Sequence, residues 1–455
     1  MSPTVTIRNK KEPILLFLGD IALFYGALWV TLFIRYAQAP TARLWATHVW
    51  PFTLLFIVWI GVFYIAGLYG KHTLVMKRRL PARILRVQLF NVMLAVAFFY
   101  FIPFLGITPK TNLFIYLLVS FVLILLWRLY GQETLGFRRR QKALLIGSGT
   151  ELKELRNEIV HNRRYNLEAI SWIDLDEVDA LDFEKDVVER IYAESVSVVA
   201  ISMHNKKVEP YLPRLYNLMF AGVGFVDMHK VYEDIFDRVP LSVLRHSWFL
   251  ENISLSPRRS YDVLKRAIDL MISLAGGVLT LPLYPLIWLA LKLDDGGPLF
   301  IEQERIGQNN RPIRILKFRS MQVDPGASPL EKEKNYVRVT RVGRWLRKSR
   351  IDELPQLWAV VRGDLSLVGP RPELPELAAE YDKQVPYYHV RHLIKPGLSG
   401  WAQLYHEAHP HHGADVEETK NKLSYDLFYI KNRSLSLDVE IIMKTLRVLV
   451  SRSGL

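Results

Sequence analysis

The chain has 455 residues, half of them hydrophobic and 12% aromatic, so there is enough apolar surface for two or three domains. It contains no cysteine, which excludes disulfides, thiolate metal sites and a cysteine nucleophile. The 59 Lys and Arg residues outnumber the 45 Asp and Glu residues and give a formal net charge of +14. This charge favours anionic lipid or phosphate-bearing substrates as partners. The sequence has no zinc finger, RNA-binding signature or basic tail, so we expect no nucleic-acid partner.

Four stretches before residue 130 are long and apolar enough to cross a bilayer. They cover residues 14–34, 51–68, 87–104 and 113–127. Basic residues gather before the first stretch, between the second and third, and after the fourth: Arg8, Lys10, Lys11, Lys71, Lys77, Arg78, Arg79, Arg83, Arg86, Arg128, Arg138, Arg139, Arg140 and Lys142. Because basic loops stay in the cytosol, we predict a four-span bundle over residues 1–140 with both ends cytoplasmic.

Two features of the first stretch need an interpretation. Asp20 lies inside it, where a carboxylate is expected to face the bundle interior and to be hydrogen-bonded, although an intramembrane acid can also be functional. Ala37-Gln38-Ala39 resembles a signal-peptide cleavage site, but the apolar stretch is too long and Pro40 would follow the cut. We therefore expect this stretch to remain as a span.

Residues 141–255 show short apolar runs that alternate with helical patterns. Strands are predicted at residues 143–146, 169–173, 196–201 and 224–227, with helices between them, which indicates a parallel, doubly wound sheet. Gly147-Ser148-Gly149 follows the first strand like the start of a dinucleotide fingerprint, and Asp174 and Asp176 lie where a ribose partner would be. Leu152, however, occupies the third glycine position. Both a bound nucleotide and a regulatory or oligomerisation module remain open.

A further apolar run, residues 268–293, lies in the third predicted domain, residues 256–455. It is long enough to span, but the basic sequence on both sides opposes translocation. Pro282 and Pro285 each remove a backbone donor and crowd the preceding turn. We predict a re-entrant helical hairpin that is broken at Pro282 and opens to the cytosol; the alternative is an ordinary fifth span kinked by the prolines.

The strongest chemical signal is the pair Asp352-Glu353. Pro355 is tolerated in a helix only in the first turn, so we expect a helix to begin near Asp352, where backbone donors favour phosphate and an ionised carboxylate. Adjacent carboxylates can share Mg²⁺, and an ionised carboxylate can attack phosphorus. The same pair is also typical of a purely structural helix start. The alternation of residues 315–321 predicts a strand with Lys317 and Arg319 on one face.

Several motifs in this order resemble the bacterial sugar transferase family, the polyprenyl-phosphate hexose-1-phosphate transferases, also called monotopic phosphoglycosyl transferases. The matching stretches are residues 264–269, 317–321, 352–356, 369–372 and 395–401. The four spans and the Rossmann-like module resemble the large form of the family. The implied fold is therefore a four-helix transmembrane bundle, a Rossmann-like α/β module and a catalytic α/β domain with a re-entrant membrane hairpin. Leu281 replaces the family's serine before Pro282, while the proline is retained.

The resemblance also implies an activity. Asp352 would attack the sugar-bearing phosphate of a UDP-sugar and expel UMP, and undecaprenyl phosphate would then take the phosphosugar. Glu353 would share Mg²⁺ with Asp352. The substrate phosphates would be bound by Lys317, Arg319, Arg347 and Arg371. A homodimer in the bacterial inner membrane, with its catalytic domain on the cytoplasmic face, would begin exopolysaccharide, capsule or O-antigen synthesis.

The stretch after Gln403 departs from the Asn-Gly-Arg-like segment of many relatives, which leaves the donor sugar open. Its histidines, which are either solvated or zinc ligands, are His406, His409, His411 and His412. Residues 437–450 have helical apolar spacing that suits either the membrane surface or the core. Three other functions are alternatives. The first is a scaffold with a degenerate catalytic domain, which intact Asp352 and Glu353 oppose. The second is an inverting glycosyltransferase, which would release UDP, and the third is an NAD-dependent enzyme, which would need a complete glycine fingerprint that is missing.

Overall fold

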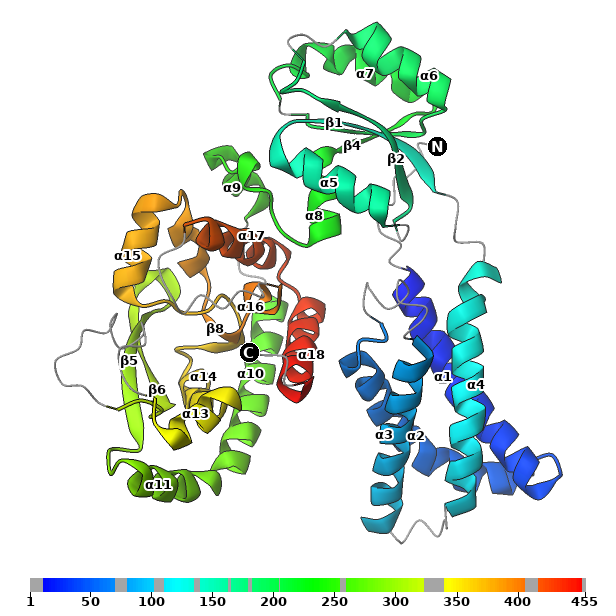
Figure 1. The fold of residues 1–455 in the computed structure, drawn as a ribbon, viewed down its shortest axis with the longest axis vertical. Helices are drawn as coiled ribbons and strands as arrows, with labels where there is room; N and C mark the ends of the chain where they lie inside the picture. The colour runs from blue at the N-terminus through cyan, green and yellow to red at the C-terminus, as the bar shows by residue number, and fades with distance from the viewer. Residues whose placement is uncertain are drawn as a thin grey trace. The chain divides into compact units, whose positions relative to one another are not determined.

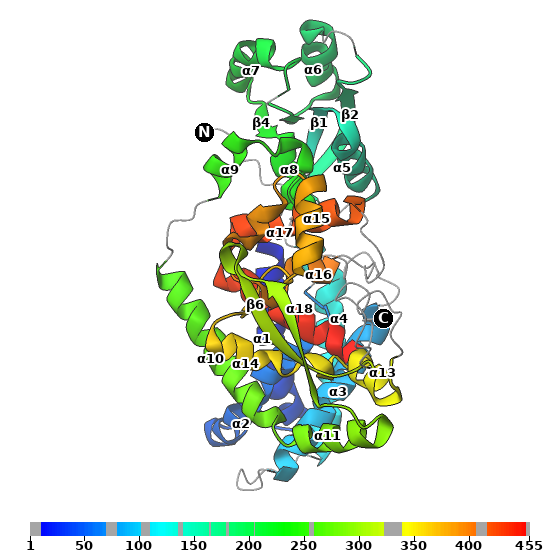
Figure 2. The ribbon, with the colours of Figure 1, turned by 90° about the vertical axis from the view of Figure 1, so that its left-hand side faces the viewer.

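The computed structural model describes residues 11–69, 80–101, 110–134, 140–162, 165–178, 182–203, 205–253, 259–322, 339–405 and 416–451. The chain forms two compact units, Met1–Val231 and Tyr232–Leu455, which are drawn in Figures 1 and 2. The predicted division into residues 1–140, 141–255 and 256–455 stays a prediction. Many of the basic residues used to orient the spans, such as Arg8, Lys77 and Arg138, lie outside the described residues.

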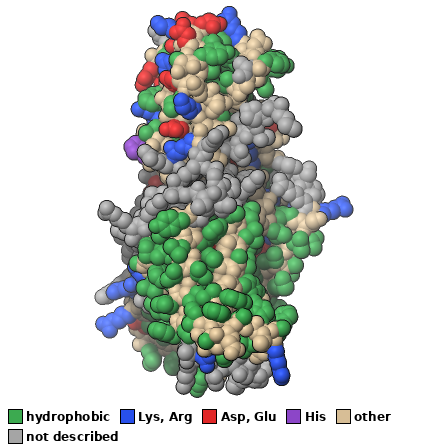
Figure 3. Space-filling view, turned by 90° about the vertical axis from the view of Figure 1, so that its right-hand side faces the viewer, with side chains coloured by type: hydrophobic (Ala, Val, Ile, Leu, Met, Phe, Trp, Pro, Cys, Tyr) green, Lys and Arg blue, Asp and Glu red, His purple; other side chains and the backbone are tan. Residues whose placement is uncertain are grey.

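The first unit begins with helices α1 (Lys11–Tyr36), α2 (Ala42–Ile65), α3 (Leu80–Phe101) and α4 (Lys110–Thr134). Each contains a segment long and apolar enough to cross a membrane, which confirms the four predicted apolar spans. Hydrophobic side chains cover the outer face of this bundle in Figure 3. Helix α2 starts well before Pro51, because Thr41 caps it by accepting a hydrogen bond from the Leu44 N–H, whereas the prediction followed hydropathy alone.

Asp20 and Arg128 form a hydrogen-bonded ion pair inside this bundle, and both side chains are almost fully buried. Arg128 also donates to the backbone carbonyl of Leu68. The interior position of Asp20 is as expected. The assignment of Arg128 to the loop after the fourth span is wrong, because α4 continues to Thr134 and carries this arginine inward. A buried carboxylate needs such a partner.

The middle of the chain contains a four-stranded parallel sheet in the order β2-β1-β3-β4. Its strands are β1 (Gln141–Gly147), β2 (Leu167–Asp174), β3 (Val198–Ile201) and β4 (Gly224–Asp227). Helix α5 (Gly149–His161) lies on one face, and α6 (Arg190–Glu194) and α7 (Leu212–Leu218) lie on the other (Figure 1). Because both faces are covered, the central strands are apolar on both sides. The predicted parallel α/β sheet is confirmed.

The second unit is mostly helical and contains two small sheets. Strands β5 (Phe300–Ile306) and β6 (Pro312–Phe318) pair antiparallel, and β7 (Ser366–Val368) and β8 (Gly397–Ser399) pair parallel. The helices are α8 (Met228–Phe236), which leads into the unit, α9 (His246–Asn252), α10 (Arg259–Thr280), α11 (Leu283–Asp294), α13 (Arg341–Lys348), α14 (Gln356–Arg362), α15 (Pro375–Gln384), α16 (Trp401–Tyr405), α17 (Val416–Asn432) and α18 (Leu435–Ser451).

The segment between α8 and α9 packs in the second unit. The Trp401 indole N–H donates to the carbonyl of Asp237 (2.8 Å), and the Val239 N–H donates to the carbonyl of Ser424 (3.1 Å). These contacts join it to α16 and α17, which contribute side chains to the largest core of this unit.

Helices α10 and α11 are both apolar and meet at an angle of 54°. The break falls at Leu281 and Pro282, and Pro282 immediately precedes α11. Pro285 lies in the first turn of α11, where a missing N–H costs no helical hydrogen bond. Large apolar side chains along both helices are exposed, with Leu279 81% and Leu293 80% accessible. The pair therefore presents an apolar surface that its own unit does not cover.

Candidate active site

Asp352 and Glu353 lie in a single 3₁₀ turn, η7 (Ile351–Glu353), between α13 and α14. Arg350 enters this turn with a left-handed backbone (φ 57°), and the Leu354 N–H closes it on the carbonyl of Ile351 (3.1 Å). The expected helix start near Asp352 is therefore wrong, since α14 begins at Gln356. The reason is that Pro355 has no N–H with which to continue an α-helical pattern back to Ile351.

Two cationic side chains from other elements reach Glu353. Arg371, which follows β7, donates from Nη2 to Glu353 Oε1 at 3.1 Å. Lys317 extends from β6 and brings Nζ to 3.9 Å from the same oxygen. Asp352 accepts no hydrogen bond from any residue that the structure describes, so its oxygens are available to a ligand. The structure thus brings together Lys317, Asp352, Glu353 and Arg371, as the motifs suggested.

These charges give the two acids different pKa values. Burial, and then the neighbouring Glu353 carboxylate, raise the pKa of Asp352 to about 6. Burial also disfavours the charge on Glu353, but Arg371, Lys317 and Arg350 outweigh it and lower its pKa to about 2. Burial lowers the pKa of Lys317 to about 8 against the opposing effect of Glu353. At neutral pH Glu353 is therefore ionised, Asp352 is mostly ionised and Lys317 is mostly protonated.

The remaining two basic candidates differ in position. Arg347, in the last turn of α13, is close enough for its charge to lower the pKa of Asp352, and its Nη1 lies 3.7 Å from Met321 Sδ. Arg319 is not part of the cluster: it is buried and forms a hydrogen-bonded ion pair with Asp295, at the end of α11. Sequence alternation placed Arg319 beside Lys317 but could not reveal this buried carboxylate partner.

Two motifs that are distant in sequence, residues 369–372 and residues 395–401, pair through their backbones and hold Arg371 in place. The Gly369 N–H donates to the carbonyl of Ser399 and the Gly397 N–H to that of Pro370, both at 2.9 Å. A Cβ atom at Gly397 would lie 2.1 Å from the Gly369 nitrogen, so the two backbones can approach only as glycines.

Arg391 anchors the same support, and no motif in the sequence pointed to it. This arginine is only 4% exposed and donates from Nη2 to the carbonyl of Arg371 (3.1 Å) and from Nη1 to Glu373 (3.4 Å). It also pairs with the buried carboxylate of Asp426 at 2.8 Å. One buried cation thereby fixes the backbone from which Arg371 reaches Glu353. The available signal was an arginine that stands, with His389 and His392, in a stretch otherwise made of aromatic and apolar residues.

The carboxylate turn also rests on the apolar helix pair. Ile351 and Leu354 pack on a small core formed by Ile287 and Leu291 of α11, together with Phe318 and Leu346. Anything that embeds α11 in lipid therefore holds Asp352 close to the lipid surface.

A divalent cation would suit the donors present. Among the described residues, no three acidic or histidine side chains come together as a metal site. Mg²⁺, however, is commonly held by one or two carboxylates together with substrate phosphates. Asp352 has unused oxygens, and its raised pKa shows that its negative charge is not fully compensated. The cluster therefore fits Mg²⁺ at Asp352, with Glu353 partly engaged by Arg371.

Two other candidate sites gain no support. His406, His409, His411 and His412 lie outside the described residues. In the middle sheet, the Gly149 N–H, which could face a phosphate, donates to Asp176 Oδ2 at 2.9 Å. Leu152 is buried in the core at the third glycine position. The Gly149 N–H is thus already hydrogen-bonded within the protein and does not face a phosphate.

The site thus combines a carboxylate pair with two cations and packs on an apolar helix pair. Residues 260–452 match the bacterial sugar transferase family. The exopolysaccharide production protein PSS of Rhizobium leguminosarum bv. phaseoli is 37% identical over 188 residues, which cover 93% of that protein and 40% of this chain. The chain belongs to the bacterial sugar transferase family.

Two longer relatives cover more of this chain. The UDP-N-acetylgalactosamine-undecaprenyl-phosphate N-acetylgalactosaminephosphotransferase of Aeromonas hydrophila is 42% identical over 51% of this chain and 54% of its own length. The undecaprenyl-phosphate glucose phosphotransferase of Komagataeibacter xylinus is 32% identical over 69% of this chain and 60% of its own length. The chain thus matches little more than half of either relative.

Proposed function

We propose that this protein transfers a hexose-1-phosphate from a UDP-sugar to undecaprenyl phosphate, with release of UMP and formation of undecaprenyl-diphosphate-sugar. The observation that carries the proposal is the free carboxylate of Asp352 next to Glu353, which is held by Arg371 and Lys317. Relatives named for UDP-sugar:undecaprenyl-phosphate sugar-phosphate transfer support it.

The first step is an attack by an Asp352 oxygen on the sugar-bearing phosphorus. An oxygen–phosphorus bond forms, the bond to the bridging oxygen breaks, and UMP leaves with that electron pair. Arg371 and Lys317 are placed to balance the charge on the phosphoryl oxygens. Because Glu353 keeps its negative charge and holds both cations, Asp352 is the carboxylate left free to react.

In the second step, an oxygen of undecaprenyl phosphate attacks the same phosphorus. The Asp352–phosphorus bond breaks, the carboxylate is regenerated, and a diphosphate links lipid and sugar. Bound Mg²⁺ would neutralise charge on the substrate phosphates. Asp352, with Glu353 beside it, would hold this ion.

The membrane arrangement is part of the proposal. We infer that α10 and α11 form a re-entrant hairpin, that the catalytic unit lies on the cytoplasmic face of a bacterial inner membrane, and that the protein is a homodimer. The break at Pro282 and the exposed apolar surface on both helices support the hairpin. The middle sheet would be a Rossmann-like regulatory or oligomerisation module. The product would begin exopolysaccharide, capsule or O-antigen synthesis.

The test compares wild type with Asp352→Asn on a panel of UDP-sugars, following nucleotide release and intact-protein mass. Wild type should release UMP and gain one sugar-phosphate in mass when the acceptor is omitted, whereas Asp352→Asn should do neither. Asp382→Asn removes an acid that pairs with His389 on the surface, so it should behave like wild type. Full turnover by Asp352→Asn, or release of UDP, would overturn the proposal.

A further inference from the structure

The inner face of the β5–β6 hairpin carries a row of polar side chains that starts at the active site. Gln303 lies opposite Ile315 and Arg305 lies opposite Ile313 in the paired strands, and both isoleucines pack on a core that α14 shares. Because alternate residues of a strand share a face, Lys317 lies on this inner face as well. Lys317, Gln303 and Arg305 therefore follow one another from the carboxylate turn toward the tip of the hairpin.

Arg305 ends this row beside the segment that carries Arg371. It is only 5% exposed, and the next residue, Ile306, donates its N–H to the carbonyl of Glu373 at 2.9 Å. Burial disfavours the charge on Glu373, but four nearby cations, Arg305 among them, outweigh it and lower its pKa. Arg305 is thus a buried cation whose charge is partly balanced by a carboxylate of the protein.

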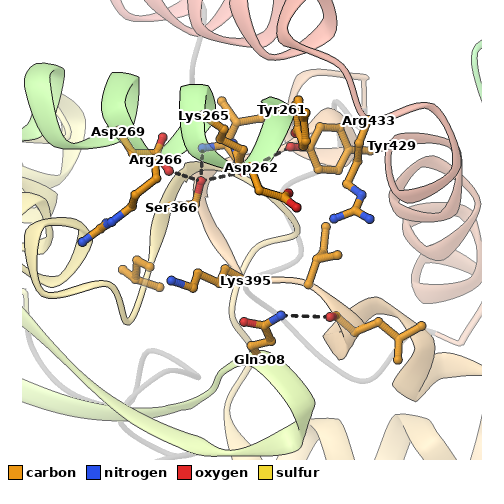
Figure 4. A pocket seen from close by; sticks show the side chains of 14 residues that line it. Tyr261, Asp262, Lys265, Arg266, Asp269, Gln308, Ser366, Lys395, Tyr429 and Arg433 are labelled. Carbon is orange, nitrogen blue, oxygen red and sulfur yellow. Dashed lines mark hydrogen bonds between the residues drawn. The ribbon is translucent and has the colours of Figure 1, made fainter. Parts of the chain in front are cut away.

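The tip of the hairpin is fixed to a 3₁₀ segment, η8 (Tyr388–Leu393). Gln308 donates from Nε2 to the carbonyl of Leu393 at 3.2 Å, at the edge of the polar cavity drawn in Figure 4. His392 Nδ1 lies 2.6 Å from Asn310 Oδ1. No member of the row lines that cavity. The hairpin is therefore held at both ends, by η8 at its tip and by the contact of Lys317 with the carboxylate turn at the other end.

The contact between Arg305 and Gln303 fixes the orientation of the Gln303 amide group. Arg305 donates from Nη2 to Gln303 Oε1 at 3.1 Å. Since a guanidinium group has donors and no acceptor, the amide must present its oxygen to Arg305. The NH₂ group of this half-buried side chain therefore remains for another acceptor, and no residue that the structure describes accepts a hydrogen bond from it.

The charges around this NH₂ group favour an anionic oxygen as its acceptor. Burial lowers the pKa of Lys317 and Glu353 opposes this effect, while Arg371 and Arg305 add to it, so the three cations are near enough to repel one another. A phosphate oxygen would accept from the amide and would also reduce this repulsion. A sugar hydroxyl would gain the hydrogen bond alone.

The donor has two phosphates, and the proposed mechanism assigns one of them to Lys317. Asp352 attacks the sugar-bearing phosphorus there, and UMP leaves from the opposite side of that phosphorus. Gln303 is the next donor in the row, farther from the carboxylate turn than Lys317. We propose that Gln303 donates from Nε2 to the phosphate that leaves in UMP, and that Arg305 is a positioning residue that holds the amide in this orientation.

This assignment adds to the chemistry as well as to binding. The UMP phosphate gains negative charge as the bond to the sugar-bearing phosphorus breaks, so a donor at that phosphate stabilises the transition state more than the bound substrate. The inference rests on the proposed transferase function.

The test measures the affinity of UMP for the detergent-solubilised full chain by isothermal titration calorimetry in a buffer that contains Mg²⁺. Gln303→Met removes the amide and should weaken UMP binding about tenfold, the usual effect of losing a hydrogen bond to a charged group. Gln303→Glu keeps the size of the side chain and an oxygen for Arg305, but it replaces the NH₂ group by an anionic oxygen and should weaken binding further. Glu302→Gln makes the reverse exchange at the neighbouring exposed residue of β5 and should retain wild-type affinity.

The role of Arg305 has its own readout. Arg305→Met should weaken UMP binding in the wild-type background and add no further loss to Gln303→Met, because Arg305 acts through the amide. Arg305→Lys can still donate to the amide oxygen and should retain most of the affinity. Additive losses would show that Arg305 acts on the ligand directly and would overturn its positioning role.

Gln303→Glu separates binding from a structural role. If Gln303 only held Arg305, the glutamate would keep both the melting temperature and the UMP affinity of wild type, and that result would overturn the proposal. A fall in kcat/KM for the UDP-sugar with unchanged UMP affinity would assign Gln303 to the sugar side and would overturn it too. Because UMP binding requires no transfer, a protein that binds UMP through Gln303 but forms no sugar-phosphate adduct would refute the transferase mechanism and leave this inference standing.

Discussion

The pH dependence of the first half-reaction follows from the two shifted groups in the cluster. In the proposed mechanism Asp352 must be ionised to attack phosphorus, and in the absence of a bound cation its pKa is raised to about 6. Lys317 must be protonated to balance the phosphoryl charge, and its pKa is lowered to about 8. The rate should therefore peak between these values and fall about tenfold from about pH 7 to about pH 5, because the ionised fraction of Asp352 falls by that factor.

The assay must leave out the acceptor, because a phosphomonoester itself loses its second proton at about pH 6. Rapid-quench measurement of UMP formed in a single turnover with a UDP-sugar isolates the attack by Asp352. Lys317→Arg provides the matched variant, since arginine keeps its proton throughout. In this variant the single-turnover rate should no longer fall at alkaline pH but should still fall at acidic pH.

A flat single-turnover rate between about pH 5 and about pH 7 would refute the assignment of Asp352 as a nucleophile with a raised pKa. An alkaline limb that persists unchanged in Lys317→Arg would show that a group other than Lys317 titrates there.

Substitutions at three places test the supports around the site and the bundle. Gly397→Ala places a methyl group against the Gly369 nitrogen and should lower both melting temperature and UMP release. Arg391→Met leaves the buried carboxylate of Asp426 and the partly buried carboxylate of Glu373 without this cation and should cost about 3–5 kcal/mol of stability in chemical denaturation. Asp20→Leu or Arg128→Leu should each destabilise the bundle by a similar amount, about 3–5 kcal/mol, while the double substitution recovers much of the loss.

Each of these has its own control. Gly61→Ala adds a methyl group where nothing described lies within 4 Å, so its melting temperature should stay near that of wild type. Arg391→Lys keeps the charge and should lose less stability than Arg391→Met. Additive losses in the Asp20 and Arg128 cycle would contradict a direct ion pair.

Local patterns predicted much of the fold. Long apolar runs predicted four spans, and alternating short runs predicted the parallel sheet. These features depend on periodicity and hydropathy within one segment. The start of α14 was misplaced because the propensity of Pro355 could not show that a separate 3₁₀ turn precedes the helix.

The sequence by itself determined which residues are candidates for the proposed chemistry, because Asp352, Glu353, Lys317 and Arg371 stand in recognisable motifs. Tertiary structure alone decided the ion-pair partners of the charged residues. Arg371 and Lys317 pair with Glu353, Arg319 pairs with Asp295, and Arg128 pairs with Asp20 inside the bundle. The physical reason is that a buried charge takes whichever opposite charge the packing of distant segments brings within reach, and no local pattern encodes that distance.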